Sequence, residues 1–137
     1  MSKPLSHHQA LIYAMVTTSA VDRHMTDGEL KRIGEIVSRL PVFQDFDDEG
    51  LVATAEACGR ILSGDNGLEQ VLKAIAGGLP DKLRETAYAV AVEIAVADLD
   101  IGQEELRFLE LLRDALDLDR LHTAAIERGA RARHMTV

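Results

Sequence analysis

The sequence contains no tryptophan, only two tyrosines and three phenylalanines, so its hydrophobic core must be built mainly from aliphatic side chains. Its single cysteine, Cys58, excludes an internal disulfide and a cysteine-based zinc site. No apolar run reaches the roughly 20 residues that a membrane-spanning helix needs. Positive charge is also scarce, and the net charge of -8 argues against non-specific nucleic-acid binding, because phosphates need a basic face. We therefore expect neither a nucleic-acid partner nor insertion into a membrane.

Catalytic signatures are missing as well. The sequence has no Ser, His and Asp arrangement, no glycine loop for phosphates and no HExxH pattern, so we expect no catalytic residue and no enzymatic activity. The first nine residues are polar and do not resemble a signal peptide, which favours a cytoplasmic protein. The length of 137 residues fits one domain over residues 1–137.

Apolar residues recur at helical spacing, and no segment shows the alternation typical of a half-buried strand. Ser6 and Gln9 have the spacing of a capping box, which predicts the start of a helix. Thr26 and Glu29 repeat that spacing. We expect an all-α, compact bundle of about seven helices, at about residues 7–22, 27–40, 48–63, 68–77, 80–98, 103–116 and from 119 onward.

The stretch Thr86–Asp100 is apolar on nearly every side of a helix. A helix of that kind must be buried on all sides, so we expect the other helices to pack around it. Leu106 and Leu121 are expected to face inward from the two helices that follow. Glu93, in the middle of the stretch, has two interpretations: it pairs with an arginine of a neighbouring helix or faces a groove, or it is an ion ligand or a buried acid with a raised pKa.

Two connections between helices carry their own signals. Pro41 is expected to end the second helix, and Phe43 and Phe46 are expected to fold back onto the bundle as apolar anchors. Gly64 is a candidate left-handed stop for the third helix. The tight turn Asp65–Gly67 then leads into the fourth.

Residues 20–40 align with residues 96–116 as an internal repeat. In this alignment Asp22 corresponds to Asp98, and the apolar positions of both helices coincide. Glu29 corresponds to Glu105, at the same distance from the aspartate in each copy. The repeat predicts two related helical hairpins packed about an approximate two-fold axis.

These patterns together resemble a known family. An apolar helix ending in Ala-Val-Asp, a short turn, Asp-Gly-Glu-Leu and a later Ala-Asp-x-Asp-x-x-x-x-Glu-Leu are similar to the TerB-like family, named for tellurite resistance, over about residues 7–117. The resemblance implies a compact bundle of about seven helices and a role in bacterial metal or oxyanion stress. It also implies metal binding by acids that map onto Asp22, Asp27, Glu29, Asp98, Asp100 and Glu105. His24 departs from the pattern, since it stands in the first turn where the second has Asp100.

The residues themselves leave two interpretations of these acids open. Asp22 and Asp98 stand near the C-terminal ends of helices, where the dipole disfavours a carboxylate, and a bound cation would compensate. Carboxylates suit Ca²⁺, Mg²⁺ or Mn²⁺, with Zn²⁺ a further candidate for a divalent metal ion. Alternatively, the acids only cap helices and form turns.

Three other residues are weaker candidates. His7 and His8 are adjacent, so on a helix they are expected not to share a face and to be poor co-ligands. Cys58 repeats at helical spacing with apolar residues and is expected to be buried. Two functions follow: a metal-binding or metal-responsive accessory protein, with a possible protein partner in a stress-response complex, or a protein-interaction module.

Overall fold

The computed structural model describes residues 4–20, 25–97 and 101–137. These residues form α-helices and two short 3-10 helices, with no strand among them, which confirms the all-α prediction. None of the helices in this part of the chain is long and apolar enough to cross a bilayer. The elements are α1 (His7–Ala20), α2 (Asp27–Arg39), η1 (Pro41–Phe43), α3 (Gly50–Leu62), α4 (Gly67–Gly78), η2 (Asp81–Leu83), α5 (Arg84–Ala97), α6 (Gln103–Ala115) and α7 (Arg120–Arg133).

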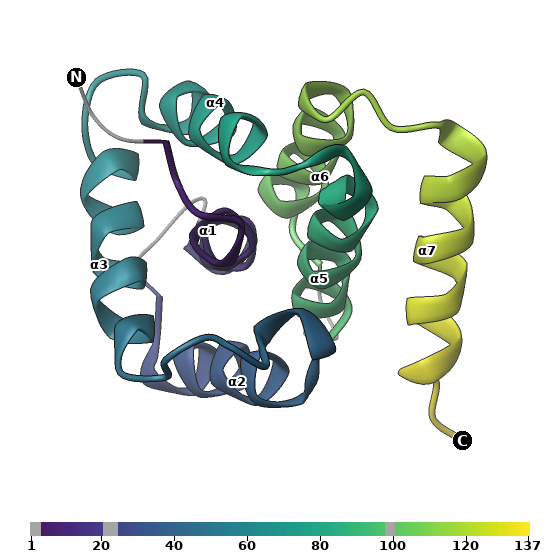
Figure 1. Ribbon diagram of the computed structural model, residues 1–137. Coiled ribbons are helices and arrows are strands. Elements are labelled where there is room, and N and C mark those ends of the chain that lie inside the picture. Colours follow the sequence, from purple (N-terminus) through teal and green to yellow (C-terminus); the bar gives the residue numbers. More distant parts are fainter. Residues whose placement is uncertain (1–3, 21–24, 98–100) are drawn as a thin grey trace.

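The central helix of the bundle is α1, and the prediction that the stretch Thr86–Asp100, which contains most of α5, is central is wrong. Every residue from 10 to 19 of α1 is buried, and Figure 1 shows α1 end-on with α2 to α6 arranged around it. α5 is largely buried, as predicted, but it forms one wall of this ring and carries α7 on its outer side. The C-terminal half of α1 is inconspicuous in the sequence because it contains buried threonines. The buried hydroxyl of Thr18 is satisfied, since its Oγ1 donates a hydrogen bond to the carbonyl oxygen of Ala14 at 2.7 Å.

The predicted helix start at Ser6 and the helix stop before Pro41 are confirmed. Ser6 Oγ accepts from the Gln9 amide at 3.1 Å, and Gln9 Oε1 accepts from the Ser6 amide at 3.0 Å. α2 ends at Arg39, and Leu40 is its C-cap directly before Pro41. The linker after it folds back as expected, with Phe43 buried and Phe46 packed against the core.

The inward faces of the last two helices differ from the prediction. Leu109 and Leu112 of α6 are buried as expected, but Leu106 is 48% exposed. α7 contacts mainly α5 (Figure 1), so it buries a narrow face that contains Thr123 and Ala130. Leu121 is 77% exposed. Both errors have one cause: each helix is covered on one side only, and apolar spacing alone does not say which side.

The left-handed residue between α3 and α4 is Asn66, with a φ of 54°. The prediction for Gly64 is wrong, since no described glycine has a positive φ. Asparagine tolerates this conformation better than most residues because its short side chain bonds locally. The glycine that the turn requires is Gly67, where an added Cβ would lie 2.3 Å from the carbonyl oxygen of Leu62.

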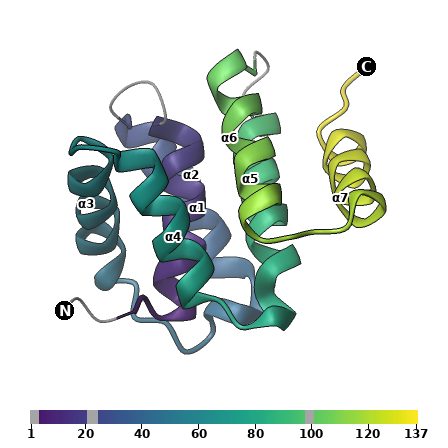
Figure 2. The same cartoon turned by 90° about the horizontal axis from the view of Figure 1, so that it is seen from above.

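The two predicted hairpins are α1–α2 and α5–α6. Figure 2 shows that α1 and α5 run toward the same end of the bundle, and that α2 and α6 both begin at that end. α1 packs directly against α5. The two helices that lead into the acidic turns, α1 and α5, therefore pack together and end at the same end of the bundle.

Candidate functional site

The six predicted site acids divide into two groups of three. Asp22, Asp98 and Asp100 lie outside the described residues, as does His24. The other three stand in the first turns of α2 and α6. These are Asp27, Glu29 and Glu105.

The start of α2 is a complete capping box. Thr26 Oγ1 accepts from the Glu29 amide at 3.2 Å, and Glu29 Oε1 accepts from the Thr26 amide at 2.8 Å. Asp27 is exposed in the same turn, where the positive end of the helix dipole stabilises a carboxylate. The capping interpretation of Glu29 is therefore confirmed, and Asp27 adds a second negative charge beside it.

The start of α6 repeats half of this arrangement. Glu105 Oε1 accepts from the Gly102 amide at 3.4 Å, but Gly102 has no side chain with which to return the bond. Glu105 and Glu29 thus occupy the same position, three residues after the N-cap. Capping does not exclude a cation, because an ionised carboxylate has about four lone-pair sites on its two oxygens.

Glu93 of α5 pairs with the C-terminal end of α7. It accepts from Arg133 Nε at 3.2 Å, and it also contacts Arg133 Nη2 and His134 Nε2. The carboxylate lies in a cleft of about 540 Å³ that Arg39 of α2 also lines. Burial raises the pKa of Glu93, but the hydrogen bonds from His134 and Arg133 outweigh it and lower the pKa overall. Pairing with an arginine is confirmed, and the alternative of a buried acid with a raised pKa is wrong.

Replacing Glu93 with glutamine should therefore destabilise the fold in a pH-dependent way. A carboxylate whose pKa is lowered on folding stabilises the protein above its unfolded pKa, and this stabilisation is lost as the pH falls through the folded value. We expect Glu93→Gln to lower the free energy of unfolding by about 0.5 to 1 kcal/mol at pH 6, with the difference shrinking below about pH 4. Urea melts of both proteins at pH 3 and pH 6 measure it. A difference that is equal at both pH values would contradict the ion pair.

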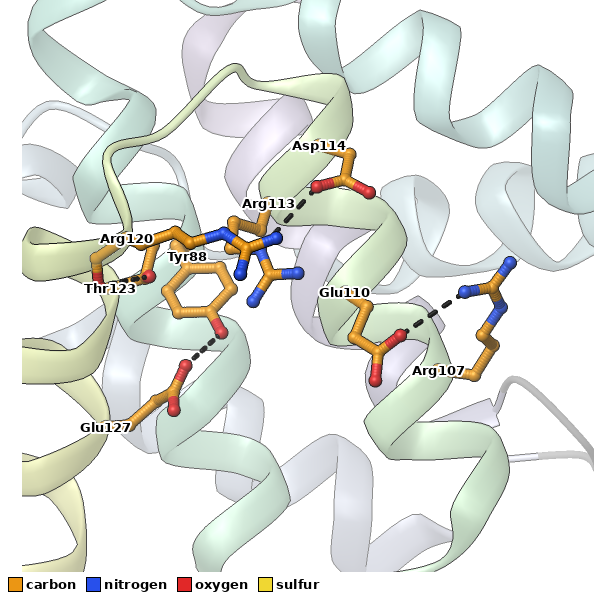
Figure 3. A network of polar contacts seen from close by, with 8 residues as sticks. All are labelled: Tyr88, Arg107, Glu110, Arg113, Asp114, Arg120, Thr123 and Glu127. Atoms are coloured by element: carbon orange, nitrogen blue, oxygen red, sulfur yellow. Dashed lines mark hydrogen bonds and ion pairs between the residues drawn. The ribbon is translucent and has the colours of Figure 1, made fainter.

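A second polar network, which the sequence analysis missed, joins α5 to α7 beside α6 (Figure 3). The Tyr88 hydroxyl donates to Glu127 Oε2 at 2.6 Å. Burial, followed by the hydrogen bond to Glu127, raises the pKa of Tyr88, so the phenol is neutral and acts as a donor. Both residues line a cleft of about 240 Å³ with Arg113 and Arg131. The available signal was a tyrosine hydroxyl within an otherwise apolar helix, which needs a partner when buried.

A third group lies at the first turn of α1. His7, His8 and Asp45 each have a potential ligand atom, and these atoms lie within 4.8 Å of one another. The ring centroids of the two histidines are 4.0 Å apart. The expectation that His7 and His8 do not share a face assumed a regular helix, but His7 is the first residue of α1, and its ligand atom lies close to that of His8. The linker between α2 and α3 brings Asp45 to His8.

Cys58 is fully buried, as predicted. Burial raises the pKa of its thiol to about 11, although a hydrogen bond with Thr17 opposes the shift. A thiol in this environment stays protonated near neutral pH and is a poor nucleophile.

Comparison with known families supports the resemblance seen in the sequence. The family model for tellurite resistance protein TerB matches residues 8–128, which covers the described helices apart from His7 of α1 and the end of α7. Neither the search of curated proteins nor that of solved structures finds a match. On the extent of the family match and the all-α bundle, the chain belongs to the TerB family.

Proposed function

We propose that this TerB-family chain is a cytoplasmic metal-binding or metal-responsive accessory protein that binds a divalent cation through the acids at its two hairpin turns. One observation carries the proposal: α2 and α6 begin at the same end of the bundle (Figure 2), and each presents a glutamate three residues after its N-cap. Two equivalent carboxylates beside two turns that hold Asp22 and Asp98 supply the oxygen ligands that Ca²⁺, Mg²⁺ and Mn²⁺ prefer.

The role that fits this arrangement is binding rather than catalysis. The four acids Asp22, Glu29, Asp98 and Glu105 provide negative charge and oxygen ligands for an ion. The family name refers to tellurite resistance. A protein partner in a stress-response complex would recognise the acidic surface in its ion-bound state. We assign no catalytic residue.

A thermal melt with and without a divalent cation tests the proposal. A ligand that binds only the folded state stabilises it by about 2.7 kcal/mol at a hundredfold excess over its dissociation constant. We expect this stabilisation with one or more of Ca²⁺, Mg²⁺, Mn²⁺ and Zn²⁺. The double variant Asp22→Asn/Asp98→Asn keeps the side-chain shape but removes two charges, so it should abolish the effect.

The matched control changes the same residue type twice at exposed positions elsewhere. Asp48→Asn/Asp65→Asn removes two negative charges outside the two acidic hairpin turns and should retain the full stabilisation. Equal loss of stabilisation in both double variants would indicate a general effect of net charge and would contradict a site at the turns.

The alternative is a protein-interaction module whose acids only cap helices. The complete capping box of Thr26 and Glu29 favours it, since it accounts for Glu29 without an ion. This alternative predicts identical melting midpoints with metal and with chelator for the parent and both double variants.

A further inference from the structure

We propose that His7, His8 and Asp45 form a separate site for a transition-metal dication of the Zn²⁺ type. The group lies at the N-terminal end of α1, whereas the first acidic turn follows its C-terminal end and the second follows α5, which ends at the same end of the bundle (Figure 2). At about 1.5 Å per residue, the helix separates the two places by about 20 Å. The two sites therefore share no ligand, and either can exist without the other.

The ligand atoms are already close to the spacing that zinc needs. Tetrahedral zinc with bonds of about 2.0–2.2 Å holds its ligand atoms about 3.4 Å apart. His8 Nε2 lies 3.1 Å from Asp45 Oδ1, and the ligand atoms of all three residues are within 4.8 Å. Asp45, whose side chain is 80% exposed, can adjust to an ion with little resistance.

The rest of the site is held in place by packing. The His8 side chain is only 11% exposed. Its ring is stacked against Phe43 at a centroid distance of 5.6 Å and lies 5.2 Å from Phe46. These two phenylalanines flank Asp45 in the linker, so the contacts that order the linker also place the carboxylate beside the imidazoles.

The donor set selects the kind of ion. Two imidazoles and one carboxylate, with no thiolate, suit Zn²⁺, Cu²⁺, Ni²⁺ or Co²⁺ better than Ca²⁺ or Mg²⁺. Three protein ligands also leave a fourth position open to water. Two features oppose binding: an ion at His8 Nε2 displaces the hydrogen bond that this atom makes to the Val42 carbonyl oxygen at 2.9 Å, and the helix dipole repels a cation there. The negative charge of Asp45 offsets the dipole.

Calorimetric titration of the full chain with zinc chloride tests the site, and titration with Co²⁺ adds a visible absorption band that reports tetrahedral coordination. The informative variants are His7→Gln and Asp45→Asn, because these side chains are less buried than that of His8 and circular dichroism can verify that the fold is kept. We expect one zinc equivalent in the parent and at least a tenfold weaker affinity in each variant, since even loss of an outer partner of a ligand costs about 10–100-fold.

Two controls separate this site from other sources of zinc binding. His122→Gln removes a histidine that pairs with one carboxylate, Glu85, at 2.9 Å, and should leave the affinity unchanged. The Asp22→Asn/Asp98→Asn double variant removes the proposed turn site and should still bind one zinc through His7, His8 and Asp45. Absence of zinc binding in the parent, or affinity within about twofold of the parent in both His7→Gln and Asp45→Asn, would overturn the proposal. Neither result bears on binding of Ca²⁺, Mg²⁺ or Mn²⁺ at the turns.

Discussion

Replacing Leu112 with alanine is expected to lower the free energy of unfolding by about 2 to 5 kcal/mol, as is usual when a buried leucine is truncated. Leu112 lies on α6 and is 0% exposed, within the core cluster that joins the helices. Removing three carbons there loses apolar burial and leaves a cavity that the neighbouring helices fill only in part. Ile33 of α2, also 0% exposed, is expected to behave in the same way.

The matched control for this prediction lies on the same helix. Leu106 is 48% exposed, so Leu106→Ala should change the free energy of unfolding by no more than about 0.5 kcal/mol. Urea denaturation of the parent and both variants measures the difference. If Leu106→Ala proved as destabilising as Leu112→Ala, the buried face of α6 would be rotated from the one described.

Replacing Gly67 with alanine is expected to destabilise the protein by about 1 to 3 kcal/mol, the usual cost of forcing atoms into a packed region. An added Cβ would lie 2.3 Å from the carbonyl oxygen of Leu62 and 2.6 Å from that of Ile61. Both are backbone atoms, so the turn between α3 and α4 must shift to admit the methyl group. We expect this loss of stability even though alanine has a higher helix propensity than glycine and Gly67 is the first residue of α4.

Gly64 provides the control, because it lies in the same turn without a comparable constraint. The nearest atom to an added Cβ, the carbonyl oxygen of Ile61, is 3.5 Å away, and Gly64 has no positive φ. Gly64→Ala should therefore be neutral or stabilise by up to about 1 kcal/mol. Thermal melts of the two variants measure the difference in stability. If Gly67→Ala melted at or above the temperature of Gly64→Ala, the close approach at Gly67 would be relieved without cost in stability.

The candidate sites were predictable to different degrees. Glu29 could be assigned to a capping box from its spacing to Thr26, because the bond joins residues three apart. Glu93 could only be given two alternatives, since its partner Arg133 is 40 residues away. Asp45 could not be identified as a ligand from the sequence, because nothing near it suggests a partnership with His7 and His8.

The sequence by itself determined the helical class, the helix starts at Ser6 and Thr26, and the stop before Pro41. These features depend on hydrogen bonds and steric limits that act over three or four residues, so the neighbouring residues in the sequence are enough to determine them. Only the tertiary structure decided that α1 rather than α5 is central, that Leu106 faces outward, and that the histidines meet Asp45. Those outcomes depend on which helices cover which faces, a choice made by packing between segments that are far apart in the chain.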